Sequence, residues 1–177
     1  MTVRTTIRAI RAATFRSMLA AIVLTALAAA ARAQPSLPAA VAVPGMAVVM
    51  TVHAVGAQIY ECAADSAGKP GWRFREPIAS LMVDGRTVGR HFAGPSWELA
   101  DGSLVVGNAT GRADGATADD IPWLKLEGSA GQGQFAKVTV VQRINTKGGA
   151  LAGACGKAGD MAAVPYASDY VFLAKAE

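Results

Sequence analysis

The chain has 177 residues, with 17 basic and 13 acidic side chains and a formal net charge of +4 at pH 7. Five of the basic side chains, all arginines, lie within residues 1–33, where there is no acid. The 144 residues that follow therefore hold 12 basic and 13 acidic side chains, a net charge of −1. This balance argues against a nucleic-acid partner, and the length suffices for one domain with its own core.

The first 33 residues have the pattern of a signal peptide. Four arginines precede an apolar run, and Ala31-Arg32-Ala33 offers small residues at the two positions that signal peptidase reads. The apolar run over 18–31 is shorter than the roughly 20 residues that a membrane-spanning helix needs. We expect cleavage after residue 33, export to the periplasm or the medium, and no transmembrane anchor after cleavage. An uncleaved anchor is the alternative.

The rest of the chain predicts an all-β domain. Residues 34–44 are rich in proline and alanine, which indicates a flexible lead-in. In residues 45–177, a single β domain, glycines separate segments rich in valine, threonine and aromatic residues. We predict an antiparallel sandwich or barrel of about eight or nine strands. The predicted strands cover 48–54, 57–63, 72–83, 86–92, 96–99, 104–108, 122–128, 134–145 and 169–175.

Turn signals separate these strands. Asp84-Gly85 is a strong signal for a two-residue hairpin, and residues 100–103 (ADGS) predict a second turn. Pro77 predicts an edge or a bulge in its strand. Longer loops are expected over 64–71, 107–120 and 146–165.

The two cysteines, Cys62 and Cys155, predict a disulfide. An even number of cysteines in an exported protein is typical of a disulfide, and two free thiols or a metal-binding pair are the alternatives. A bridge across 93 positions would stabilise the fold by on the order of 4 kcal/mol. It would also place an early strand beside the loop that precedes the last strand, which favours a closed or nearly closed sheet.

One segment, residues 89–107, holds the candidates for catalysis. If residues 92–96 bend, His91 and Glu98 can approach, and a histidine with a carboxylate can perform general acid–base chemistry. Ser96 lies nearby, but its surroundings lack the G-x-S-x-G pattern of a nucleophile elbow. A hydrolytic or metal-dependent enzyme that uses His91 and Glu98 is therefore one hypothesis. A structural histidine, bonded to the backbone or to Glu98, is its alternative.

We expect no metal site and no cofactor. The two histidines, His53 and His91, occur without H-x-H, H-E-x-x-H or C-x-x-C spacing. The acidic residues within 112–120 lack the spacing of a calcium loop. Gly131-Gln132-Gly133 is not followed by a predicted helix, as a nucleotide-binding loop requires.

The leading hypothesis is a non-enzymatic exported domain, either a binding module or an envelope-associated one. Its ligand would be a small molecule or a glycan held by Trp97, His91 and Glu98. Trp97 would supply a flat apolar face, and the other two side chains would orient polar groups. Core packing is the alternative role for Trp97. In a third, purely structural hypothesis, the segment HFAGPSWE fixes a tight bend.

An ordered set of motifs runs through residues 44–172: AQIYEC, GWRF, GRHFAGPSWELADGS, IPWLKL, KVTVVQRINTKGG, a late cysteine and VPYASDYVF. This set resembles the DUF3455 family, a group of exported bacterial and fungal proteins of unknown function. The resemblance implies that both cysteines are part of the family pattern, which supports the disulfide. It implies no catalytic role. The family pattern centres on His91, Gly94, Pro95, Trp97 and Glu98.

Overall fold

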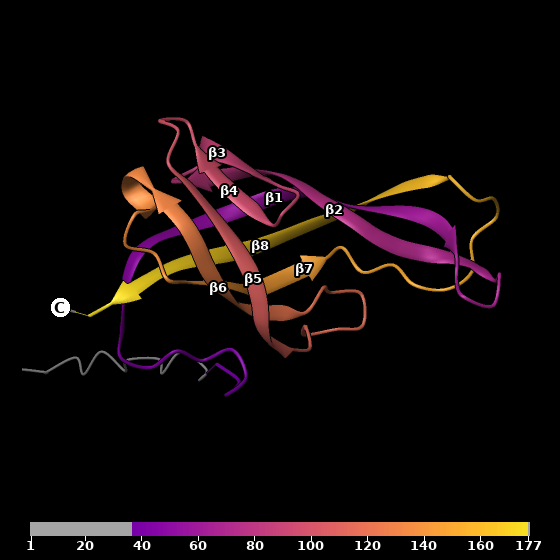
Figure 1. Ribbon diagram of the computed structural model, residues 1–177, viewed down its shortest axis with the longest axis horizontal. Coiled ribbons are helices and arrows are strands. Elements are labelled where there is room, and N and C mark those ends of the chain that lie inside the picture. Colours follow the sequence, from indigo (N-terminus) through magenta and orange to yellow (C-terminus); the bar gives the residue numbers. More distant parts are fainter. Residues whose placement is uncertain (1–36, 177) are drawn as a thin grey trace, which may run out of the picture. The chain divides into compact units, whose positions relative to one another are not determined.

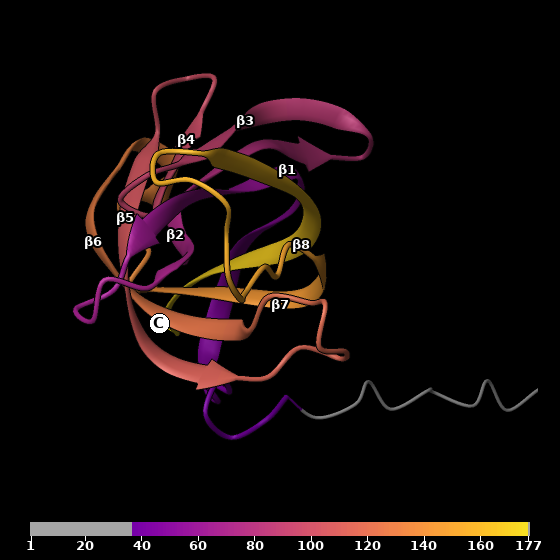
Figure 2. The ribbon, with the colours of Figure 1, turned by 90° about the vertical axis from the view of Figure 1, so that its right-hand side faces the viewer.

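The computed structural model describes residues 37–176. The expected signal peptide, with its cleavage site, and the first residues of the lead-in lie outside the described residues. The described chain forms an antiparallel sheet of eight strands that closes into a barrel (Figures 1 and 2). The elements are β1 (Met46–Ala64), β2 (Pro70–Val83), β3 (Arg86–Phe92), β4 (Ser96–Leu99), β5 (Leu104–Ala113), β6 (Trp123–Gln132), the 3₁₀ helix η1 (Gly133–Phe135), β7 (Val140–Gly148) and β8 (Met161–Lys175).

The strands pair in chain order, and β8 closes the barrel by pairing with β1. This arrangement decides between the two predicted architectures in favour of the barrel. The hairpin between β2 and β3 forms where the sequence predicts it. Asp84 and Gly85 both have positive φ, at 48° and 75°, as a tight hairpin of the twisted type I′ requires. Among the described residues, no helix is long and apolar enough to cross a membrane.

The first two predicted strands, 48–54 and 57–63, form the single strand β1. Gly56, which suggested a break, lies within this strand and faces β2. A Cβ atom at this position would collide with the carbonyl oxygen of Ile78, so glycine here permits the two strands to approach closely. The glycine therefore marks a close contact between two backbones, rather than a turn.

Three other boundaries differ from the sequence prediction. β5 continues through Ala113 into the expected loop, and β8 begins at Met161, eight residues before its predicted start at 169. The predicted strand over 134–145 is replaced by η1 and the later strand β7. Phe135, the last residue of η1, is fully buried in the core, and the pairing of β7 with β6 begins only at Val140.

A disulfide joins Cys62 on β1 to Cys155 in the loop between β7 and β8, with the Cα atoms 5.8 Å apart. The predicted disulfide is thus confirmed. The loop also forms backbone hydrogen bonds with the neighbouring strands, from the Trp72 amide to the Gly153 carbonyl and from the Cys62 amide to the Asp160 carbonyl. The bridge therefore fastens the long connection to β1 and β2.

The described part of the lead-in packs against the outside of the barrel, which differs from the flexible segment that composition suggested. Val41 is fully buried, and its carbonyl accepts a hydrogen bond of 2.6 Å from the Gln142 side chain. A Cβ at Gly111 would collide with the Ala40 carbonyl. Because proline and alanine carry no periodic pattern, only the tertiary contact reveals that this segment is held in place.

Candidate ligand cavity

A cavity of about 1140 Å³ occupies one end of the barrel. Its rim includes the turn between β3 and β4, the connection between β5 and β6, and the first residues after β7. In Figure 1, η1 and the C-terminal end of β8 lie at the opposite end, and Figure 2 shows the ring of strands. The volume suits an organic molecule of moderate size, and the mouth of a β-barrel is a common place for such a site.

Aromatic rings form the inner wall of the cavity. His91 on β3 and Trp97 on β4 are cross-strand partners, and their rings stack with centroids 4.7 Å apart. Tyr170 on β8 contacts both rings, at 4.8 Å from His91 and 5.2 Å from Trp97. All three side chains are buried and line the cavity. Two of the predicted ligand residues, His91 and Trp97, are therefore neighbours in the wall of a cavity.

His91 is held as a neutral imidazole. Its Nδ1 lies 2.8 Å from the Ser96 carbonyl oxygen, which can only accept, so Nδ1 carries the proton and Nε2 is left as an acceptor. Burial lowers the pKa of His91 to about 4, against the opposing effect of the Ser96 carbonyl and with a further contribution from the Arg143 charge. At neutral pH the ring therefore brings a hydrogen-bond acceptor to the cavity and no charge.

Three buried side chains of the cavity wall have polar atoms without a hydrogen-bond partner of normal geometry among the described residues. These atoms are Gln58 Nε2, Trp97 Nε1 and the Tyr170 hydroxyl. Gln58 and Tyr170 both lie within reach of the Tyr166 hydroxyl, which is their polar neighbour behind the wall. Tyr60, a fourth wall residue, differs because its hydroxyl donates a bond of 2.7 Å to the Gly149 carbonyl. Buried donors without bonds of normal geometry cost free energy, and a molecule in the adjoining cavity can offer them better partners.

Arg143 brings a positive charge to the same end of the interior. It pairs in register with Tyr170 and follows the fully buried Val141 by two positions, so its side chain shares their inward face. Its Nε donates to the Pro122 carbonyl at 3.0 Å. Sequence analysis did not single out Arg143, Gln58 or Tyr170. Alternation along their strands is a signal for such residues, but it does not show which face of a strand is inside.

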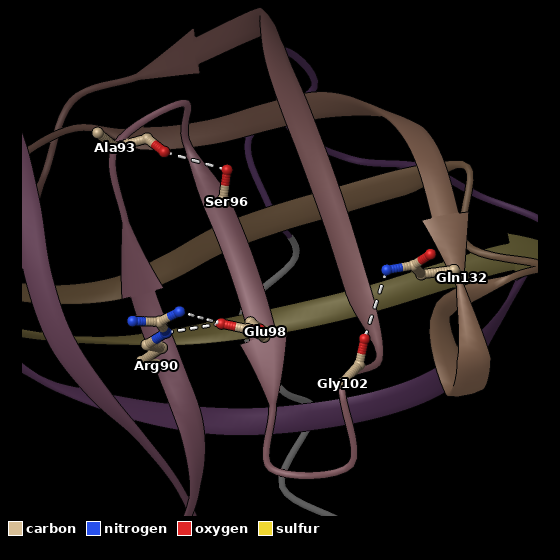
Figure 3. A network of polar contacts seen from close by, with 6 residues as sticks. All are labelled: Arg90, Ala93, Ser96, Glu98, Gly102 and Gln132. Atoms are coloured by element: carbon tan, nitrogen blue, oxygen red, sulfur yellow. Dashed lines mark hydrogen bonds and ion pairs between the residues drawn. The ribbon is translucent and has the colours of Figure 1, made fainter.

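The structure does not bring Glu98 to the cavity or to His91. In register, Arg90 pairs with Glu98 while His91 pairs with Trp97, and successive side chains of a strand point to opposite faces. Glu98 therefore lies on the outside of the barrel, where its carboxylate accepts bonds of 2.6 Å from Arg90 Nε and Nη2 (Figure 3). His91 therefore has no Glu98 carboxylate beside it, and the predicted acid–base pair does not form.

Ser96 has a local structural role in the turn between β3 and β4. Its hydroxyl donates a 3.0 Å hydrogen bond to the Ala93 carbonyl (Figure 3). Gly94 has a φ of 134°, in the region that favours glycine, and a Cβ there would collide with the Ser96 hydroxyl. The same turn presents the Ser96 carbonyl to His91. This part of the HFAGPSWE segment both shapes the hairpin and sets the histidine tautomer.

The second histidine, His53, lies on the outer surface and takes no part in the cavity. Its Nδ1 is 2.8 Å from Asp169 Oδ1, and the Asn145 amide donates to the other oxygen of this carboxylate at 2.8 Å. The two histidines of the chain are therefore apart. Among residues 37–176, no three histidine, cysteine or acidic side chains gather in a way that could hold a metal ion.

Fold and site together define a class: a closed antiparallel β-barrel with an apolar core at one end and a ligand-sized cavity at the other. The chain belongs to the DUF3455 family, described as proteins of unknown function, whose family model matches residues 43–174. No curated protein and no solved structure matches the chain. The resemblance noted from the motifs is thereby confirmed, and it carries no assigned activity.

Proposed function

We propose that this protein is an exported, non-enzymatic binding protein that holds a small molecule in the cavity of its barrel. The observation that carries the proposal is the cavity of about 1140 Å³, whose lining includes buried polar side chains that lack hydrogen bonds of normal geometry. A bound molecule would supply the missing hydrogen-bond partners and would cover the aromatic wall. In this proposal, His91 supplies a polar anchor through Nε2, and Trp97 stacks behind it at the inner end of the cavity.

Export rests on the signal-peptide pattern of residues 1–33 and on the disulfide, which is typical of proteins outside the reducing cytosol. The alternative of an enzyme that uses His91 and Glu98 loses support, because these residues lie on opposite faces of the sheet. A purely structural role of the HFAGPSWE hairpin accounts for Gly94 and Ser96. It does not account for the open volume next to Trp97.

The test is thermal unfolding of the oxidised protein, obtained by expressing the full chain, against a panel of ligands. The panel contains sugars, nucleotides, small organic acids, and divalent metals with and without a chelator. A ligand at about 100 times its dissociation constant stabilises the fold by about 2.7 kcal/mol, which raises the midpoint by several degrees in a domain of this size.

Two variants locate the site. Gln58→Leu changes the cavity wall and should abolish the shift, whereas Glu98→Gln changes the outer face and should preserve it. A panel that stabilises nothing would overturn the proposal. It would also be overturned by a shift that Glu98→Gln removes and Gln58→Leu retains, because the ligand would then bind outside the barrel.

A further inference from the structure

The cavity lining contains a positive charge that pairs with no acid among residues 37–176. The charge belongs to Arg143, a part-buried side chain, and an arginine keeps its charge at any physiological pH. Arg143 forms no ion pair with any residue in the described part of the chain. Its one hydrogen bond there, from Nε to the Pro122 carbonyl, orients the guanidinium and leaves its charge uncompensated.

Most of the other charges around the cavity have the same sign as Arg143. Arg75 and Arg112 also line it, and Asp119 is the single acid among the residues of the lining. Arg75 is already engaged at the rim, at 3.4 Å from Glu76. The balance therefore favours a ligand with negative charge, in contrast to the chain from residue 34 onward, whose net charge is −1.

The charge of Arg143 acts on the side chains that surround the cavity. It contributes to lowering the pKa of His91 and partly offsets the rise that burial causes in the pKa of Tyr60. Arg143 lines the same cavity as His91 and Tyr60, so its side chain is part of the polar wall. His91 is neutral and adds no second charge, so Arg143 is the cationic anchor of this inner wall.

The rest of the wall is suited to a flat apolar group. Trp97 and Tyr170 close its inner end with buried rings, and the accessible apolar surface comes from Phe74, Leu124 and Leu151. The Trp97 and Tyr170 rings are almost entirely buried in the wall. A sugar ring that stacks on an exposed tryptophan is less compatible with such a wall than a planar group that enters the cavity.

We propose that the ligand is a small aromatic organic acid, with its acid group on Arg143 and its ring against the accessible apolar side chains of Phe74, Leu124 and Leu151. Hydrogen-bond donors near the acid group come from Gln58 and from the Tyr170 hydroxyl. His91 Nε2 accepts a hydrogen bond from a hydroxyl or amine group of the ligand. This inference rests on the proposed function, because it names the class of molecule that the same cavity binds.

A pair of fluorescent probes tests the inference. 8-Anilino-1-naphthalenesulfonate carries an aromatic body and a negative charge, and N-phenyl-1-naphthylamine has the same body without the charge. Both become fluorescent when they enter an apolar site. For the oxidised protein from the full chain, the anionic probe should bind at least tenfold more tightly than the neutral one.

Variants then assign the preference to one residue. Arg143→Met should reduce affinity for the anionic probe about tenfold and leave the neutral probe unchanged. Arg143→Lys, which keeps the charge, should retain part of the preference. Arg86→Met removes an exposed arginine in the hairpin between β2 and β3 and serves as the matched control, with no change for either probe.

The outcomes separate the inference from the proposed function. Equal affinity of the wild-type protein for both probes would overturn the preference for an acid and leave the binding cavity in place. An unchanged preference in folded Arg143→Met would overturn the role of Arg143. Failure of both probes, with no stabilisation by any ligand of the panel, would overturn the inference together with the proposed function. Stabilisation by neutral sugars alone would replace the acid with a glycan.

Discussion

The two ends of the barrel interior use the same strands but different chemistry. At the end near η1, Phe135 and Phe172 stack with ring centroids 4.4 Å apart within a core of aliphatic side chains. At the other end, Tyr170 on the same strand as Phe172 faces a cavity together with His91 and Arg143. A barrel of eight strands is just wide enough for side chains to fill it. The cavity therefore reflects the choice of side chains, rather than the width of the barrel.

This difference teaches how stability and binding are divided along one set of strands. The packed end gains free energy from buried apolar surface. The open end holds buried donors without hydrogen bonds of normal geometry and a part-buried arginine that forms no ion pair with residues 37–176. The buried donors cost free energy until a ligand offers them better partners. The packed end must therefore stabilise the barrel while the open end remains available.

The largest difference between the two ends should come from truncated aromatic rings. Phe172→Ala removes a fully buried ring from the packed end and should lower the free energy of unfolding by up to about 5 kcal/mol. Phe74→Ala truncates a half-exposed ring at the cavity rim and should cost about 1 kcal/mol or less. Urea unfolding measures both changes. Similar losses would mean that the rim is as tightly packed as the core.

The disulfide should be the main support of the connection beside the open end. Replacing Cys62 and Cys155 together by serine should reduce the free energy of unfolding by about 4 kcal/mol, chiefly because the unfolded chain gains freedom. Unfolding in urea with and without reductant gives the measurement. Reductant should destabilise the wild-type protein to a similar extent and leave the double variant unaffected.

The neutral state of His91 should make the stability of the open end depend on pH. The folded pKa of about 4 lies below the ordinary value of 6.5, so the unfolded chain takes up the proton first as the pH falls. The free energy of unfolding should therefore decrease between pH 6.5 and pH 4, by about 3 kcal/mol in total. Urea unfolding at a series of pH values measures this decrease. In His91→Gln, which cannot titrate, a slope of the same size over this range would contradict the assignment.

The smallest expected change in the free energy of unfolding comes from two buried glutamines, Gln58 and Gln142, whose replacement should have opposite effects. Gln58 lies in the cavity wall beside Tyr166, and its amide nitrogen has no hydrogen bond of normal geometry, whereas the Gln142 amide donates to the Val41 carbonyl. Gln58→Leu should raise the free energy of unfolding by about 1 kcal/mol, and Gln142→Leu should lower it by about as much or more. Thermal unfolding of the two variants gives the sign of each change. Destabilisation by both would show that the Gln58 amide is satisfied in the folded protein.

Much of the fold follows from local patterns. The turn at Asp84-Gly85 was predictable because both positions tolerate a left-handed backbone. The ends of β5 and β8 were not, because residues such as Ala113 and Met161 extend their strands through pairing with a neighbour instead of through their own preference. The predicted break at Gly56 was wrong for a related reason. A glycine that ends a strand and a glycine that lets a neighbouring strand approach closely look alike in the sequence.

The candidate site was partly predictable. His91 and Trp97 were identified within one segment, and the structure places both in the cavity wall. Alternation along SWEL already implies that Trp97 and Glu98 point to opposite faces. Arg143 comes from a segment about 50 positions later in the chain, and no local pattern connects it with His91.

By itself, the sequence determined the all-β class, the disulfide pair and the segment that carries the family motifs. All three features follow from residue types and their spacing along the chain, and the disulfide follows from the chemistry of two cysteines. The tertiary structure alone decided that the sheet closes, that Trp97 faces inward while Glu98 faces outward, and that Arg143 joins them at one end. The physical reason is register: pairing of β8 with β1 closes the sheet, and closure turns one face of every strand into an interior.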